Sequence, residues 1–140
     1  MEEVITVNQA TNHNQRRVRF CYFAEPIPQP RQNRNTRWGD DKAAVAAQRY
    51  NEWRATFHDE IKVAMLQHGI EQFPAAPLAL KVEFYFTRSY RHCDLSNLVK
   101  ALEDCLNKTI ITDDRWIDEI SASRHIGVGN YIVFEVRYLL

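Results

Sequence analysis

The sequence has few cysteines and no spacing that would use them. Its 140 residues include three cysteines, too few and too widely separated for a disulfide framework. No Cys-x-x-Cys or His-x-x-x-His spacing occurs, which argues against a zinc site. No apolar run reaches the ~20 residues that a transmembrane helix needs, and the acidic, polar start lacks the apolar centre of a signal peptide. These absences predict a cytoplasmic protein with no membrane partner.

The sequence also lacks net charge. Lysine plus arginine and aspartate plus glutamate both number 18, whereas a general polyanion-binding protein is usually basic. Several arginines are nevertheless gathered in short stretches, so one face of the fold has to collect them if nucleic acid binds. The arginines in two of these stretches are Arg31, Arg34, Arg37, Arg88 and Arg91.

The periodicity of the apolar residues predicts four strands and two helices. Apolar residues make up 45% of the chain, which is enough for one compact core. Residues 1–15 show no periodicity and are expected to be a flexible tail, which leaves 16–140 as a single domain. Alternation with period two predicts strands, and apolar residues at three- and four-residue steps predict helices. The predicted strands are 17–23, 78–86, 117–124 and 131–138, and the predicted helices are 41–69 and 95–107.

The resulting order, β-α-β-α-β-β, is typical of an α+β fold in which two helices cover one mixed sheet. The last two strands are expected to pair through the connection GVGN. Between the first strand and the first helix, three prolines within five residues (PIPQP) forbid a helix and predict an extended loop. Tyr50 and Trp53 lie on the apolar stripe of the first helix and are expected to pack in the core.

The stretch RHCDLSNLVKALEDCLNKTIITDD (91–114) concentrates groups suited to metal and phosphate chemistry. Asp94 precedes the second predicted helix, Asn97 and Lys100 lie within it, and Asp113 and Asp114 follow it. Mg²⁺ prefers carboxylate oxygens, and a lysine can stabilise negative charge that develops on a phosphate. A helix N-terminus repels cations, so a metal there needs several anions. A purely structural interpretation stays open, namely a capped helix, a solvent-exposed lysine and a polar turn.

A shared metal site would require Asp94 and Asp114 to meet. A helix of about 13 residues is about 20 Å long, and the residues 108–114 can span about 23 Å when fully extended. The chain can therefore return to the helix start if 108–114 runs back almost straight. The spacing permits this site without requiring it.

The segment DLSNLVKALEDCLNKTIITDD resembles the RusA family of Holliday-junction resolvases. That family shows Asp-x-Asp-Asn-Leu-x-Lys, then Asp-Ala-Leu, and then an Asp-Asp pair. The upstream segments PIPQPRQNR and YNEW are also similar to the family. The residues that fall on the family pattern are Asp94, Asn97, Leu98, Lys100, Asp104, Leu106, Asp113 and Asp114.

The resemblance implies a homodimer that binds four-way DNA junctions and nicks two strands symmetrically with Mg²⁺, or with Mn²⁺ in its place. Asp94 and Asp114 would be metal ligands, and Asp113 a further candidate ligand. Lys100 would assist at the phosphate, and Asn97 would support the loop or the ligand geometry. The residues expected to contact DNA are Arg31, Arg34, Arg37, Arg88 and Arg91.

Ser96 departs from the family pattern, which has a second metal-binding aspartate at this position. Serine is neutral and a weak Mg²⁺ ligand that at best holds the ion through a water, so metal binding is expected to be weaker. Three explanations stay open: an inactive member that still binds DNA, another acid such as Asp113 or Glu83 in the same role, or an engineered change. The chain is therefore expected to be a junction-resolving endodeoxyribonuclease, active or weakened, or alternatively a non-catalytic junction-binding protein.

Overall fold

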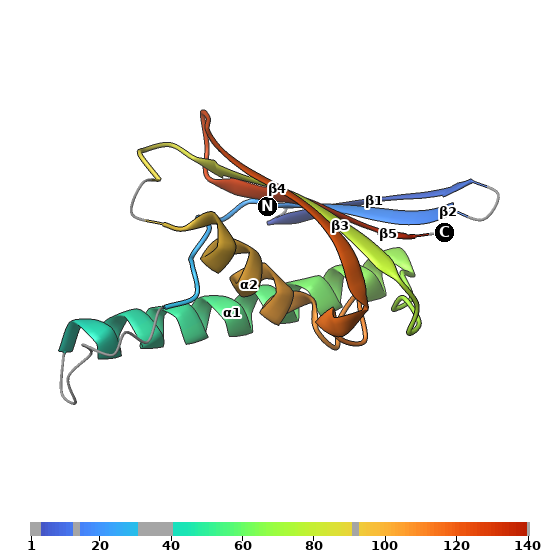
Figure 1. The fold of residues 1–140 in the computed structure, drawn as a ribbon, viewed down its shortest axis with the longest axis horizontal. Helices are drawn as coiled ribbons and strands as arrows, with labels where there is room; N and C mark the ends of the chain where they lie inside the picture. Colours follow the sequence, from blue (N-terminus) through green and yellow to red (C-terminus); the bar gives the residue numbers. More distant parts are fainter. Residues whose placement is uncertain (1–3, 13–14, 31–40, 91–92, 140) are drawn as a thin grey trace.

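A computed structural model describes residues 4–12, 15–30, 41–90 and 93–139. Its strands form one sheet in the order β1-β2-β5-β3-β4, and both helices cover the same face of that sheet (Figure 1). This arrangement confirms the predicted α+β fold, with a mixed sheet and two helices in a single small domain. The elements are β1 (Ile5–Asn12), β2 (Gln15–Tyr22), α1 (Asp41–His68), β3 (Leu78–Phe86), α2 (Leu95–Leu106), the 3₁₀ turn η1 (Asp114–Trp116), β4 (Ile117–Ile126) and β5 (Tyr131–Tyr138).

The N-terminal segment differs from the expected flexible tail. Residues 5–12 form β1, which pairs antiparallel with β2 along its full length. Ile5 and Val7 are half-buried and pack against the core. Ile5 and Val7 are separated by one polar residue, but apart from Ala10 the rest of β1 is polar, so the segment gives too weak a period-two signal to predict a strand.

The last two strands do not form the expected hairpin, because β3 lies between them. β3 runs parallel to β4 and antiparallel to β5. The connection between β4 and β5 crosses the end of β3, where the Gly127 N–H donates to the Phe86 carbonyl at 2.8 Å and the Thr87 N–H donates to Asn130 Oδ1 at 3.0 Å. β3 is the most continuously buried strand, and a position between two partners satisfies its backbone groups on both edges.

The core lies between the sheet and the two helices. On α2, Leu98, Leu102 and Leu106 recur at four-residue steps and are at most 1% exposed, which confirms the predicted apolar face of this helix. Tyr50 is buried and Trp53 is half-buried, as expected for core packing. The stretch 44–49 of α1 is exposed, so the first turns of this helix extend past the sheet (Figure 1). None of the described helices is long and apolar enough to cross a membrane.

The opposite face of the sheet carries polar and aromatic side chains. The Tyr85 ring stacks on both His125 and Tyr131, with ring centroids 5.0 and 4.3 Å away. The Tyr85 hydroxyl donates to Glu83 Oε2 at 2.6 Å. Because side chains alternate along a strand and Phe84 faces the helices, Glu83 points away from α2. Glu83 therefore does not supply the carboxylate that Ser96 lacks.

Candidate functional site

Asp94 occupies the N-cap position of α2, with extended backbone angles of φ −75° and ψ 136°. Its backbone carbonyl accepts hydrogen bonds from the N–H groups of Asn97 and Leu98, both at 3.1 Å. Its side chain makes no capping hydrogen bond. Asp94 is therefore the N-cap residue by position, without a capping hydrogen bond to its side chain.

Arg124 on β4 fastens the start of α2 to the sheet. Its guanidinium donates a hydrogen bond to the Cys93 carbonyl and lies 4.8 Å from the centre of the Tyr90 ring. Burial raises the pKa of the Cys93 thiol, and the charges of Arg124 and Asp94 act on the same thiol in opposite directions. A positive charge thus accompanies Asp94 at this end of the helix. Sequence reasoning missed Arg124, although it shares the period-two face of β4 with Ala122.

The chain turns sharply at the end of α2. The Thr109 hydroxyl donates to backbone carbonyls of the last helical turn at 2.8 and 2.9 Å, and Lys108 adopts a left-handed φ of 64°. These contacts satisfy carbonyls that a helix end leaves without partners. The nearly straight return that would bring Asp114 to Asp94 is therefore not formed.

Asp114 instead joins Glu103 in the C-terminal part of α2. Burial first, and then the hydrogen bond to Asp114 and its charge, raise the pKa of Glu103 to about 7, against which the charge of Lys100 acts. Asp113 continues the chain of carboxyl groups through a hydrogen bond with Asp114. Its Oδ1 accepts the Arg115 N–H at 2.9 Å, and this bond is the main reason that the pKa of Asp113 is lowered. The structure thus gathers Glu103, Asp113 and Asp114 near Lys100, and we call these three carboxyl groups the acidic cluster.

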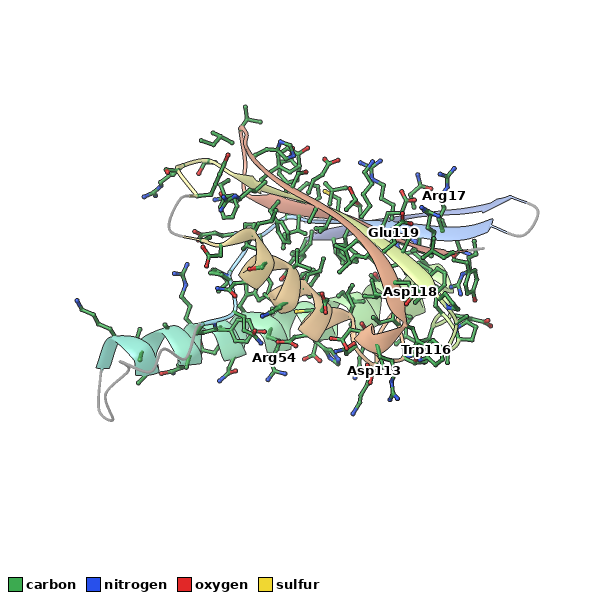
Figure 2. All side chains as sticks on the ribbon, viewed as in Figure 1. Arg17, Arg54, Asp113, Trp116, Asp118 and Glu119 are labelled. Carbon is green, nitrogen blue, oxygen red and sulfur yellow. The ribbon has the colours of Figure 1, made fainter. Side chains whose placement is uncertain are left out.

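The acidic cluster lies at one end of a stripe on α2. Ser96, Lys100 and Glu103 follow one another at steps of four and three residues, which brings their side chains to one side of the helix. Asp94 precedes Glu103 by nine residues, or about 13 Å along the axis. The described chain therefore brings Lys100, Asp113 and Asp114 together and leaves Asp94 towards the other end, while Asp113 lies beyond the C-terminal end of α2 (Figure 2).

Glu103 is the residue of this site that sequence reasoning missed. The family pattern does not include position 103, and a glutamate on a helix is usually exposed to solvent. Its step of three residues from Lys100 was the available signal. That step shows which face of the helix Glu103 shares, but the position of Asp114 follows from the turn after the helix.

Two further residues of the pattern hold neighbouring segments. The Asn97 carbonyl accepts the Gln29 N–H at 3.1 Å, which ties the segment 24–30 to α2. Asp104 Oδ2 accepts the Tyr50 hydroxyl and the Gln29 side-chain amide at 3.1 Å. Burial and the bond to Asp104 both raise the pKa of the Tyr50 hydroxyl. Asp104 therefore connects α1 and the segment 24–30 to α2.

The predicted DNA-contacting arginines are only partly described. Arg88 is exposed in the loop between β3 and α2. Arg31, Arg34, Arg37 and Arg91 lie outside the described residues, so their contacts with DNA stay predictions.

The chemistry of the acidic cluster fits a hard divalent cation. Carboxylate oxygens are the ligands that Mg²⁺ prefers, and two carboxylates in hydrogen-bond contact repel each other once both are ionised. A cation between them relieves that repulsion. Within the described ranges, no group of three or more His, Cys, Asp or Glu residues could hold a metal ion, so fewer than three of these carboxyl groups could be ligands of one cation. Water and phosphate oxygens would therefore have to complete the coordination.

Carboxyl groups clustered beside a lysine define a site suited to metal-assisted phosphodiester chemistry. The sequence profile of the family described as endodeoxyribonuclease RusA matches residues 24–137. The chain belongs to this family, which confirms the resemblance seen in the stretch 94–114. Strands β1 and β2 precede the matched region. A comparison with curated proteins gives no match.

Proposed function

We propose that this chain is a structure-specific endodeoxyribonuclease that nicks four-way (Holliday) DNA junctions. Membership of an endodeoxyribonuclease family supports the reaction class. The observation that carries the proposal is the closeness of Glu103 to Asp114 and Lys100: Asp114 raises the pKa of Glu103, and the charge of Lys100 lowers it. Metal-assisted hydrolysis of a phosphodiester needs anionic groups for the cation and a cationic group for the phosphate. Symmetric nicking needs two such sites, so we also propose a homodimer.

The residues of the acidic cluster and Lys100 would have different roles in the reaction. Asp114 and Glu103 would hold Mg²⁺, which when bound supplies an activated water and a Lewis acid. Asp113, itself fixed by the Arg115 backbone, would orient Asp114. The ammonium group of Lys100 would pair with a non-bridging phosphate oxygen and stabilise the negative charge that builds towards the departing 3′ oxygen.

Asp94 remains a predicted ligand with a separate position. Because it lies about 13 Å along the helix axis from Glu103, it would not share one cation with the Glu103–Asp114 pair inside one subunit. It would instead place a second anion at the opposite end of the stripe, beside Ser96. Its contribution is tested separately from that of Asp114.

In this proposal, Glu103 compensates for the acid that is missing at Ser96. An aspartate at position 96 would share the side of α2 that carries Lys100 and Glu103, whereas the serine adds no charge there. The Glu103 carboxyl group, in contact with Asp114, supplies a second acidic ligand. We propose that this replacement preserves cleavage at a reduced level.

The direct test uses a synthetic four-way junction with Mg²⁺ or Mn²⁺, followed by mapping of the nicks on both strands. We expect symmetric nicks that disappear in Asp114→Asn and fall strongly in Glu103→Gln. The matched control is Asp59→Asn, because the Asp59 side chain is 80% exposed on α1. Asp94→Asn shows whether the ligand set extends to the helix start. Failure of both the natural sequence and Ser96→Asp to nick any junction would reject the nuclease.

A second candidate, a junction-binding protein without catalysis, is favoured by Ser96 alone. The loss of one acid from the family pattern would weaken metal binding while leaving the basic residues in place. In that case junction binding would be tight, salt-sensitive and unaffected by a chelator, and Ser96→Asp would not restore nicking.

A further inference from the structure

We propose that two copies of this chain pair through β4, so that their sheets join into one continuous sheet across a two-fold axis. The inference concerns the homodimer put forward above and names its surface; it does not depend on cleavage. β4 spans ten residues and ends the strand order, with β3 as its one neighbour among the described strands. Its outer row of backbone N–H and C=O groups therefore faces outward and can pair with another strand.

β4 lacks some of the features that protect edge strands, although it carries the charged residues Asp118, Glu119 and Arg124 and a register irregularity opposite Leu78 and Ala79. Natural edges carry lysines, prolines or short strands, whereas the sequence IDEISASRHI contains neither lysine nor proline. Ile120 and Ile126 are 46% and 63% exposed. They stand in register with Leu80 and Phe86 on β3, which are almost fully buried. The apolar layer of the core thus continues to the free edge of β4 at Ile120 and Ile126.

The charges along β4 identify the second strand as another β4 in antiparallel orientation. Asp118 and Glu119 lie at its start (Figure 2), and Arg124 and His125 lie near its end. A two-fold axis places the acidic start of one copy opposite the basic end of the other. A parallel arrangement would instead set acids against acids and bases against bases, which is unfavourable across strands.

The alternation of side chains limits the registers in which the two copies of β4 can pair. Residues that face each other across an antiparallel pair lie on the same face of the sheet, so a two-fold axis perpendicular to the sheet passes midway between the two copies of one residue. An axis at Ala122 sets Glu119 opposite the partner's His125 and Ser121 opposite the partner's Ser123. Ser121, Ala122 and Ser123 are small, so the backbones can approach at the axis. Glu119 also lies 3.6 Å from Arg137, and this pair would border the interface.

This pairing would also arrange the two candidate sites. Arg124, two residues from the proposed axis, bonds to the Cys93 carbonyl next to Asp94. The starts of the two α2 helices would therefore flank the axis. Because the axis is perpendicular to the sheet, both copies would present their helices on the same face. A symmetric substrate would then meet two equivalent sites on one side of the dimer.

Proline substitutions at two adjacent positions test the edge. Successive N–H groups of a strand point to opposite edges, so one of Ser121→Pro and Ala122→Pro removes an N–H from the free edge and spares the ladder with β3. The variant that unfolds thermally like the natural chain is the informative one. In analytical ultracentrifugation we expect it to be monomeric where the natural chain is dimeric, with a dimer Kd raised at least about tenfold. Thr6→Pro on the other edge strand, β1, is the matched control and should remain dimeric.

A cysteine at the axis gives an independent measurement. Ala122→Cys should form a covalent dimer with a short bis-maleimide, whereas Lys108→Cys, exposed beyond α2, should not. A natural chain that stays monomeric overturns the inference. A folded proline variant that stays dimeric, together with no cross-link at position 122, also overturns it. If junctions are nicked by a dimer that uses another surface, only the inference fails; if β4 pairs but no junction is nicked, only the proposed function fails.

Discussion

The Glu103–Asp114 pair should make the stability of the metal-free protein fall as the pH rises from about 4.5 to about 7. The pKa of Glu103 is raised in the folded chain from its ordinary 4.5 to about 7, first by burial and then by Asp114. Between these pH values the folded chain therefore holds a proton that the unfolded chain has released. The free energy of unfolding decreases with rising pH wherever the folded state binds more protons than the unfolded state.

The size of this effect follows from the same two values. The difference between 4.5 and about 7 is worth at most about 3.4 kcal/mol at 1.36 kcal/mol per pH unit. Glu103 is only half-buried, so solvent screening reduces the expected loss to about 1–2 kcal/mol. Below about pH 4.5 the contribution is fully present, and above about pH 7 it is lost.

The assay is urea unfolding in a chelating buffer at several pH values from 4.5 to 8, for the natural chain and for Glu103→Gln. The glutamine keeps the size of the side chain and cannot release a proton, so we expect the variant to lack this 1–2 kcal/mol (approximately) of pH dependence. Mg²⁺ should stabilise the natural chain more at pH 8 than at pH 5, because a cation replaces the shared proton. An identical pH dependence in the two proteins would refute the assignment of the pair.

Three further substitutions test other parts of the site. Position 96 lies seven residues from Glu103, about 10 Å along the axis of α2, so Ser96→Asp should leave Mg²⁺ binding at the Glu103–Asp114 pair nearly unchanged in calorimetry; a gain of about tenfold would show that position 96 belongs to the same ligand set. Lys100→Met should lower kcat on junctions by about 10²-fold or more with little change in metal affinity or in thermal unfolding; an equal loss of metal affinity would assign the lysine to folding of the site. Asp104→Ala should cost about 1–3 kcal/mol of unfolding free energy, because the buried Tyr50 hydroxyl loses its acceptor, and Asp104→Asn should recover part of it.

The local periodicity of apolar residues was sufficient to predict most of the helices and strands. The leucines of α2 and the alternating residues of β3 each bury one face, so their pattern reports directly on their structure. The position of β3 between β4 and β5 could not be read in this way, because it depends on which strand needs partners on both edges. A four-residue connection suggests a hairpin by its length, yet here it crosses the end of β3.

The role of the predicted site residues stays a prediction, and their geometry could not be read from the sequence. The pattern identified Lys100, Asp113 and Asp114, which the fold gathers. The reach of the segment 108–114 allowed Asp114 to return to Asp94, but chain length sets only an upper limit. The Thr109 hydroxyl and the left-handed Lys108 close a tight turn instead, and that turn delivers Asp114 to Glu103.

The central place of β5 has a consequence for how this chain assembles. β5 joins β2 on one side to β3 on the other, although it follows the other described strands in the chain. Until residues 131–138 emerge, the sheet exists only as two separate parts, β1 with β2 and β3 with β4. Such distant contacts slow folding, and a ribosome that stalls before β5 would hold two unfinished half-sheets with their inner edges exposed.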